Sequence, residues 1–72
     1  MVKVLIKIDL LRRERRTQDL TQEELAVKAG ITADFLGAIE RGQKQPSVVT
    51  LAKLAHALGK KVDDFLDVTN NG

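Results

Sequence analysis

Few side chains in this sequence could support catalysis or metal binding. The chain has no cysteine and one histidine, His56, so a thiolate nucleophile and a cysteine-based zinc site are excluded, and a lone imidazole does not make a metal site. No nucleophile, base and orienting group are arranged together, and no glycine-rich loop could cradle a phosphate. The sequence therefore predicts a protein that is not an enzyme and that uses no cofactor or metal.

The basic side chains favour a different chemistry, the binding of an anion. Lys and Arg number 12 against 10 Asp and Glu, a net charge of only +2, but residues 1–16 hold six basic side chains against Asp9 and Glu14. In this segment Arg12, Arg13 and Arg16 could face phosphates, although a run of charges is more often a solvated surface. This end of the chain carries the positive field that a polyanion requires.

The composition is typical of one soluble globular domain. The 72 residues leave room for a single modest core, and 43% apolar with 31% charged residues argues against wholesale disorder. No apolar stretch approaches the roughly 20 residues of a membrane helix, and no signal peptide is recognisable. With the absence of cysteine, these features predict a cytoplasmic protein without a membrane partner.

Two short helices joined by a tight turn are predicted between residues 22 and 41. Thr21 and Glu24 have the spacing of a capping box, so a helix should begin at Gln22 and run to about residue 29. Gly30 can adopt the left-handed conformation found at helix ends, and Thr32 can cap a second helix over residues 33–41.

Three further helices are expected around this pair. Residues 9–18 are rich in Leu, Arg and Glu, Ser47 can cap a helix that ends near Gly59, and a short helix should cover 62–67. Residues 2–8 leave two alternatives open. Apolar residues alternate there with period two, as in an extended arm, but part of the pattern also fits an extension of the first helix.

One face of the second helix of the pair could enter a major groove. Two helices that cross at about a right angle need a small residue where they approach, and Ala26 could provide it. The positions expected to face the core are Leu25, Ile31, Leu36 and Ile39. The positions expected to point outward are Ala33, Asp34, Gly37 and Ala38. This narrow outward face is the candidate reading surface.

Several motifs occur in a fixed order and spacing. They are LTQEELA at 20–26, GIT at 30–32, IERG at 39–42, PS at 46–47 and LAKLAHALG at 51–59. Together they resemble the lambda-repressor-like, Cro/XRE-type helix-turn-helix family over about residues 9–67. The resemblance implies an all-α, five-helix DNA-binding domain, preceded by an arm or helix extension at 1–8 and followed by a polar tail at 68–72. Residues 35–42 are also similar to restriction-modification controller proteins.

The resemblance implies roles for individual residues. Gln22 matches a glutamine that touches the DNA backbone and the edge of the reading helix, and the alternative is an exposed residue beside the capping box. Thr21 and Thr32 cap helices whose N-terminal amides can also meet phosphates. Arg15 and Glu40 match a partly buried ion pair that fixes the reading helix, with the arginine near a phosphate.

The loop after the second helix is implied to grip phosphate. Arg41, Lys44 and the amides around Gly42 match the family positions with this role, although loop cations are common on any surface. The outward face itself offers little for base readout. Ala33 or Ala38 could touch a thymine methyl, and Asp34 could accept from cytosine. The alternative for this aspartate is stabilisation by the helix dipole.

The expected function is sequence-specific DNA binding by a bacterial or phage transcriptional regulator, a repressor that acts as a homodimer on a palindromic operator. The predicted dimer interface is Phe65, Leu66 and Val68, and the N-terminal arm is the rival surface. The alternatives are an antitoxin or controller protein of a small operon, with a toxin or polymerase as protein partner, and a protein-interaction module of the same fold that does not bind DNA.

Overall fold

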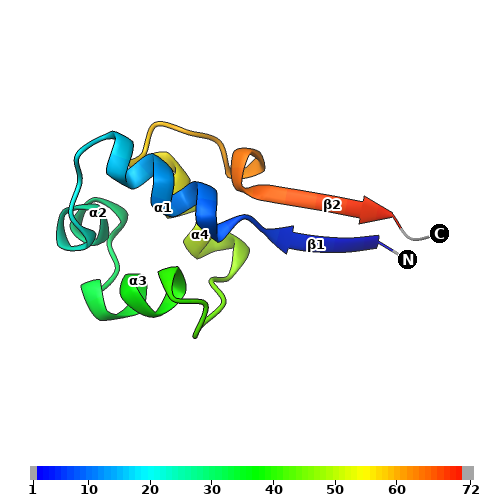
Figure 1. Cartoon of the computed structure of the whole chain (residues 1–72), viewed down its shortest axis with the longest axis horizontal. Coiled ribbons are helices and arrows are strands. Elements are labelled where there is room, and N and C mark those ends of the chain that lie inside the picture. Colours follow the sequence, from blue (N-terminus) through cyan, green and yellow to red (C-terminus); the bar gives the residue numbers. More distant parts are fainter. Residues whose placement is uncertain (1, 71–72) are drawn as a thin grey trace.

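The computed structural model describes residues 2–70, and its helices form a body from which a two-stranded ribbon projects (Figure 1). In chain order the elements are β1 Val2–Ile6, α1 Ile8–Thr17, α2 Gln22–Ala29, α3 Ala33–Glu40, α4 Val48–Ala57, the 3₁₀ turn η1 Val62–Phe65 and β2 Leu66–Asn70. The positions of α1 to α4 agree with the helices that the sequence predicts. None of the helices within residues 2–70 has the length and hydropathy of a membrane-spanning segment.

The two terminal strands form a small antiparallel sheet. Val2 lies opposite Asn70 and Ile6 lies opposite Leu66. The expected five-helix fold is therefore only partly right, because the structure has four α-helices among the described residues, plus this ribbon. The predicted last helix at 62–67 is wrong beyond η1, since the backbone from Leu66 onward hydrogen-bonds with β1. Of the two alternatives for residues 2–8, the extended one is confirmed for β1.

Aliphatic side chains from all four helices build the core. The largest fully buried side chains are Leu11, Leu25, Leu36, Ile39, Leu51 and Leu54. Ala26 is also buried, and Ile31 is partly buried against the core, as the sequence predicts.

The predicted dimer interface needs correction at Phe65. This side chain is only 3% exposed and belongs to the core, because η1 turns it inward against the helices. Leu66 is half-buried and packs against the same core. The side chain of Val68 lies outside the described residues. Phe65 and Leu66 therefore pack with the core of their own chain.

Candidate nucleic-acid interface

A hollow between α2 and α3 brings together most of the residues that the sequence predicts to meet DNA. Its lining consists of Arg15, Thr21, Gln22, Glu23, Ala33, Asp34, Gly37 and Arg41. All of these except Glu23 belong to the predicted set. We call this hollow the α2–α3 groove. Thr32, Ala38 and Lys44, the other members of the predicted set, are not part of its lining.

Local signals fix the two helices that form the groove. Thr21 and Glu24 make the expected capping box. The Glu24 N–H donates to Thr21 Oγ1, and the Thr21 N–H donates to Glu24 Oε1, each at 3.0 Å. Gly30 ends α2 in the left-handed conformation, at φ 73°. The Thr32 hydroxyl then accepts from the Phe35 N–H at 3.1 Å and caps α3. The N-termini of both helices are therefore set by capping hydrogen bonds.

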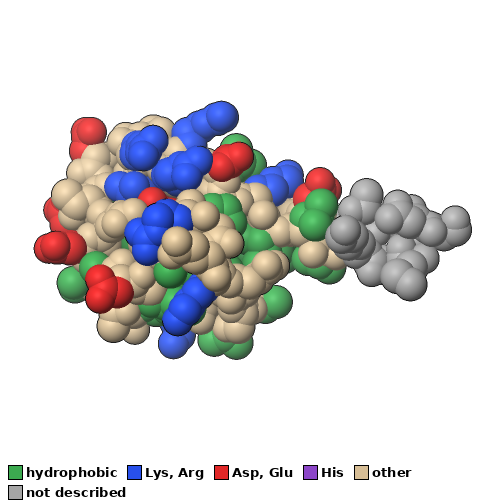
Figure 2. Space-filling view, turned by 60° about the horizontal axis from the view of Figure 1, so that its bottom comes forward, with side chains coloured by type: hydrophobic (Ala, Val, Ile, Leu, Met, Phe, Trp, Pro, Cys, Tyr) green, Lys and Arg blue, Asp and Glu red, His purple; other side chains and the backbone are tan. Residues whose placement is uncertain are grey.

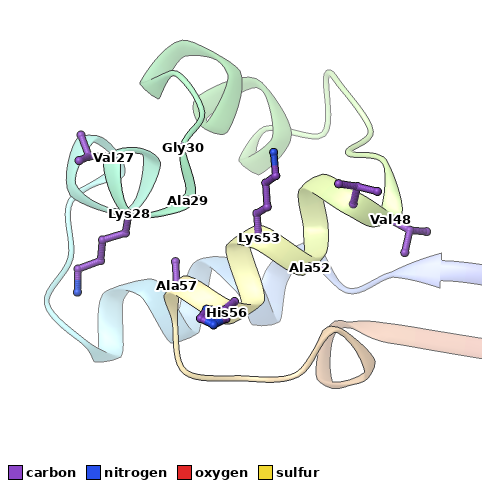
Figure 3. Close-up of a pocket in the computed structure, with 10 residues that line it drawn as sticks. Val27, Lys28, Ala29, Gly30, Val48, Ala52, Lys53, His56 and Ala57 are labelled. Carbon is purple, nitrogen blue, oxygen red and sulfur yellow. The ribbon is translucent and has the colours of Figure 1, made fainter.

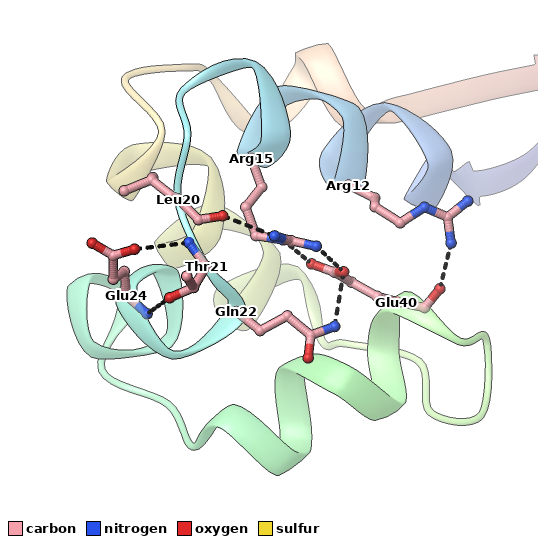
Figure 4. A network of polar contacts seen from close by, with 7 residues as sticks. All are labelled: Arg12, Arg15, Leu20, Thr21, Gln22, Glu24 and Glu40. Carbon is pink, nitrogen blue, oxygen red and sulfur yellow. Dashed lines mark hydrogen bonds and ion pairs between the residues drawn. The ribbon is translucent and has the colours of Figure 1, made fainter.

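A buried ion pair ties the end of α3 to α1 (Figure 4). Arg15 donates from Nε to Glu40 Oε2 at 2.7 Å and from Nη2 to Glu40 Oε1 at 2.9 Å. The two residues are only 8% and 4% exposed. Arg15 Nη1 also donates to the carbonyl oxygen of Leu20 at 2.8 Å, so the guanidinium joins three segments of the chain. The structure thus brings together the two residues that the resemblance pairs.

Two further side chains join this network, and sequence reasoning did not find their contacts. Gln22 Nε2 donates to Glu40 Oε1 at 3.1 Å, so this glutamine is held by the ion pair at the wall of the groove. Arg12 Nη1 donates to the main-chain oxygen of Glu40 at 3.1 Å, and its Nη2 pairs with Asp9 at 2.9 Å. Arg12 therefore supports α3 as well as adding positive charge.

The network keeps both partners of the ion pair charged. Burial by itself raises the pKa of Glu40, but hydrogen bonds from Arg15 and Gln22 and the charges of Arg15 and Arg12 leave the pKa below its usual value. The hydrogen bond to Glu40 raises the pKa of Arg15, against the effect of burial. The groove wall therefore stays charged and fixed at neutral pH.

The outward face of α3 is less open than expected. Asp34 is exposed and Ala33 half-buried, but Ala38 is only 8% exposed, so its expected outward position is wrong. It is buried where the chain after α3 folds back, since the amides of Gln43 and Lys44 both donate to its carbonyl oxygen. Gly37 is also buried, close to the Arg41 side chain.

The loop after α3 offers side chains but fewer free amides than expected. The N–H groups of Gly42, Gln43 and Lys44 donate to carbonyl oxygens at the end of α3, at 3.0, 2.9 and 3.3 Å. These amides are therefore not free to grip phosphate. The Arg41 and Lys44 side chains are exposed. Figure 2, in which the α3 side comes forward, shows Lys and Arg side chains in a band across the body and several acidic ones toward its left edge.

A second hollow, between α2 and α4, has a different character (Figure 3). Exposed valines contribute to it from both helices, namely Val27, Val48 and Val49. Lys28 and Lys53 also lie in its lining, which contains no acidic residue. His56 is exposed here, as the sequence predicts. Among residues 2–70 no three His, Cys, Asp or Glu side chains gather as a metal-binding group.

Comparison with known proteins agrees with this geometry. The HTH_3 family profile, described as helix-turn-helix, matches residues 11–65. The HTH-type transcriptional regulator y4dJ of Sinorhizobium fredii is 47% identical over 47 residues, which are 65% of this chain and 61% of that protein. The immunity repressor of Bacillus phage phi105 is 43% identical over 56 residues, 78% of this chain and 37% of the repressor.

A solved structure extends the comparison to the fold. The restriction-modification controller protein C.AhdI from Aeromonas hydrophila superposes with a TM-score of 0.78 at 37% identity, over 82% of this chain and 91% of that chain. The chain thus spans less than two thirds of the two sequence relatives but nearly all of the controller protein.

Proposed function

Because the chain belongs to the HTH_3, Cro/XRE-type family of helix-turn-helix transcriptional regulators, we propose that it represses transcription by binding an operator in double-stranded DNA. The observation that carries this proposal is the α2–α3 groove, where Gln22 and Arg41 line one hollow. The Arg15–Glu40 pair holds α3 and Gln22 in place. A preformed groove with a fixed helix suits a rigid duplex better than a mobile surface would.

The charge distribution indicates which side chains would attract the duplex. Asp34 and Glu23 line the groove and repel phosphates, so attraction to the duplex must come from the cations around it. Arg41, Lys44, Arg13 and Arg16 are exposed and could supply these contacts. We expect phosphate contacts to position the protein and the short face of α3 to contribute limited base readout. We also expect the protein to act in the cytoplasm.

Salt-dependent binding to duplex DNA tests the proposal. Binding to random-sequence and genomic fragments should weaken linearly with log salt, with a slope of about −0.9 per phosphate contacted. The double variant Gln22→Ala/Arg41→Ala should lose this binding while keeping its cooperative thermal unfolding. Lys61→Ala is a matched control, because this exposed lysine lies in the segment between α4 and η1, on the side of the molecule away from α3 (Figure 1).

Two outcomes would contradict the proposal. A wild-type chain that forms no DNA complex at low salt would favour the alternative of a protein-interaction module with the same fold. A double variant that binds as well as the wild type would show that DNA docks elsewhere. The alternative of a controller of a small operon, supported by the likeness to C.AhdI, shares the DNA mechanism and adds a protein partner.

We further propose that the protein works as a symmetric homodimer and that the β1–β2 ribbon contributes the contact. A two-stranded ribbon is marginally stable in water by itself, and its open edges are templates for further pairing. On β1, Val4 is 50% and Leu5 44% exposed. Successive side chains of a strand point to opposite faces, so the ribbon exposes apolar surface on both. A twin copy would cover this surface and place two α3 helices for two half-sites.

A further inference from the structure

We propose that Arg41 reads a guanine in the major groove. Its side chain lies back along α3 over Gly37, which has no side chain to block it, and we call this path over Gly37 the track. This inference rests on the proposed DNA binding and gives it a specific reading residue. It assigns Arg41 a role beyond a contact between the loop and phosphate, and it explains how a helix face with few polar side chains could still select a sequence.

The position of the Arg41 side chain is the main observation. A Cβ atom added at Gly37 would lie 3.0 Å from Arg41 Nη1 and 3.8 Å from Arg41 Cζ. Long side chains on a helix point back over the preceding turn, so a residue covers the position four before its own. The guanidinium of Arg41 therefore lies across Gly37 on the groove side of α3, while its Nε is held by the Gln43 side chain of the loop.

Contacts around Arg41 orient its donors without using all of them. Arg41 Nε donates to Gln43 Oε1 at 3.2 Å. The terminal nitrogens Nη1 and Nη2 make no hydrogen bond to any residue within 2–70 in this structure. An arginine fork donates to O6 and N7 of guanine together, which is the commonest specific contact in the major groove. The Gln43 contact would hold the guanidinium while its outer nitrogens meet the base.

No other described side chain in the α2–α3 groove can make this contact. Ala33 and Gly37 have no donor, and Asp34 can only accept when ionised. Gln22 gives one of its two Nε2 hydrogens to Glu40 and keeps only one, and Thr21 has a single hydroxyl, so neither can form a fork. Arg15 is committed to Glu40 and to the Leu20 carbonyl. Arg41 is therefore the one groove residue with an oriented pair of available donors.

Parallel selections test the proposal. Duplexes with a random core would be selected with the wild type, with Arg41→Lys and with Lys44→Ala, and base preferences would be compared position by position. The wild type should enrich guanine at a fixed position of the selected site. Arg41→Lys keeps the charge but loses the planar fork, so preference for that guanine should fall roughly 5- to 150-fold while other positions keep theirs. Lys44→Ala should weaken binding evenly and keep the guanine.

A second variant tests the track itself. Gly37→Leu keeps Arg41 but places a side chain where the guanidinium lies, so it should lose the same guanine preference. The atoms nearest to the new Cβ are Arg41 Nη1 at 3.0 Å and Gln22 Oε1 at 3.5 Å, so the thermal unfolding of this variant and its binding to random-sequence duplex are measured beside its base preference.

The outcomes separate this inference from the proposed function. If Arg41→Lys keeps the guanine preference, or loses affinity evenly for all sequences, Arg41 contacts phosphate and the inference is wrong while DNA binding stands. If Gly37→Leu keeps the preference, the track is wrong. If the wild type enriches no sequence and shows no salt-dependent binding to any duplex, the proposed function fails as well.

Discussion

At the scale of single residues, the Arg15–Glu40 pair connects the stability of the domain to its reading surface. Both side chains of the pair are almost fully buried, and Glu40 directly precedes Arg41 in the chain. Glu40 also receives the hydrogen bond that holds Gln22 at the groove. A change at this pair should therefore reach two of the proposed DNA contacts as well as the fold.

Removal of one partner should destabilise the protein more than removal of both. Arg15→Met leaves the Glu40 carboxylate buried without its partner, and we expect the free energy of unfolding to fall by about 3 to 5 kcal/mol. The double variant Arg15→Met/Glu40→Leu should recover most of this loss, since neither buried charge remains. Urea unfolding at pH 7 measures both. Equal losses in the single and double variants would contradict this account of the pair.

The lowered pKa of Glu40 predicts the response to acid. A carboxyl whose pKa is lower in the folded than in the unfolded state stabilises the fold above its unfolded pKa, about 4.3 for Glu. This stabilisation is lost as the pH falls through the folded pKa. We therefore expect stability to fall below about pH 5, and less steeply in Glu40→Gln than in the wild type.

An exposed carboxyl provides the control for this pH series. The Thr21 backbone N–H lowers the pKa of Glu24, but this side chain is exposed. Glu24→Gln should therefore change the acid limb of the stability profile less than Glu40→Gln does. The reverse order would show that the cap, and not the buried pair, governs acid unfolding.

Sequence reasoning reached some of these residues and not others, for physical reasons. The Arg15–Glu40 pair was found because the family resemblance carries it. The donation from Gln22 to Glu40 and that from Arg12 to the Glu40 carbonyl join residues 18 and 28 positions apart, and no local pattern records such contacts. Ala38 was misplaced because helical periodicity does not show that the following loop folds back over it.

At the scale of elements, α3 is an eight-residue helix that depends on its cap and its packing. An isolated helix of this length is not stable in water. Thr32→Ala removes the hydroxyl that accepts from the Phe35 N–H and should destabilise the protein by about 1 kcal/mol. Thr32→Ser keeps the acceptor and should stay close to the wild type. Thermal unfolding compares the two, and equal destabilisation would mean that the hydroxyl does not matter.

The elements that the sequence predicts correctly are those with local signals. The capping box and the glycine at φ 73° set both ends of α2 as expected. The ribbon could not be predicted in the same way, because β1 and β2 pair residues that lie 60 to 68 positions apart in the chain. The sequence of residues 66–70 does not by itself predict a strand. These residues form one because β1 lies beside them.

At the scale of the whole molecule, the elongated shape separates the ribbon from the α2–α3 groove. The protein measures 40 × 22 × 18 Å, and the ribbon lies along the long axis, beyond the helical body (Figure 1). The exposed Val4 and Leu5 side chains therefore lie away from the α2–α3 groove. An association through the ribbon would leave both grooves of a dimer accessible to DNA.

Replacement of an exposed ribbon residue should therefore separate dimer formation from folding. Val4→Lys places a charge on the apolar surface of the ribbon, and sedimentation should show a monomer at concentrations where the wild type is a dimer. A monomer contacts about half as many phosphates, so the salt dependence of its DNA binding should be about half as steep. Val27→Lys is the matched control, because Val27 is 80% exposed on α2, outside the ribbon.

A wild type that sediments as a monomer would contradict the dimer. A dimer that Val4→Lys leaves intact would exclude the ribbon, and a dimer lost in Val27→Lys would place the contact at the hollow between α2 and α4.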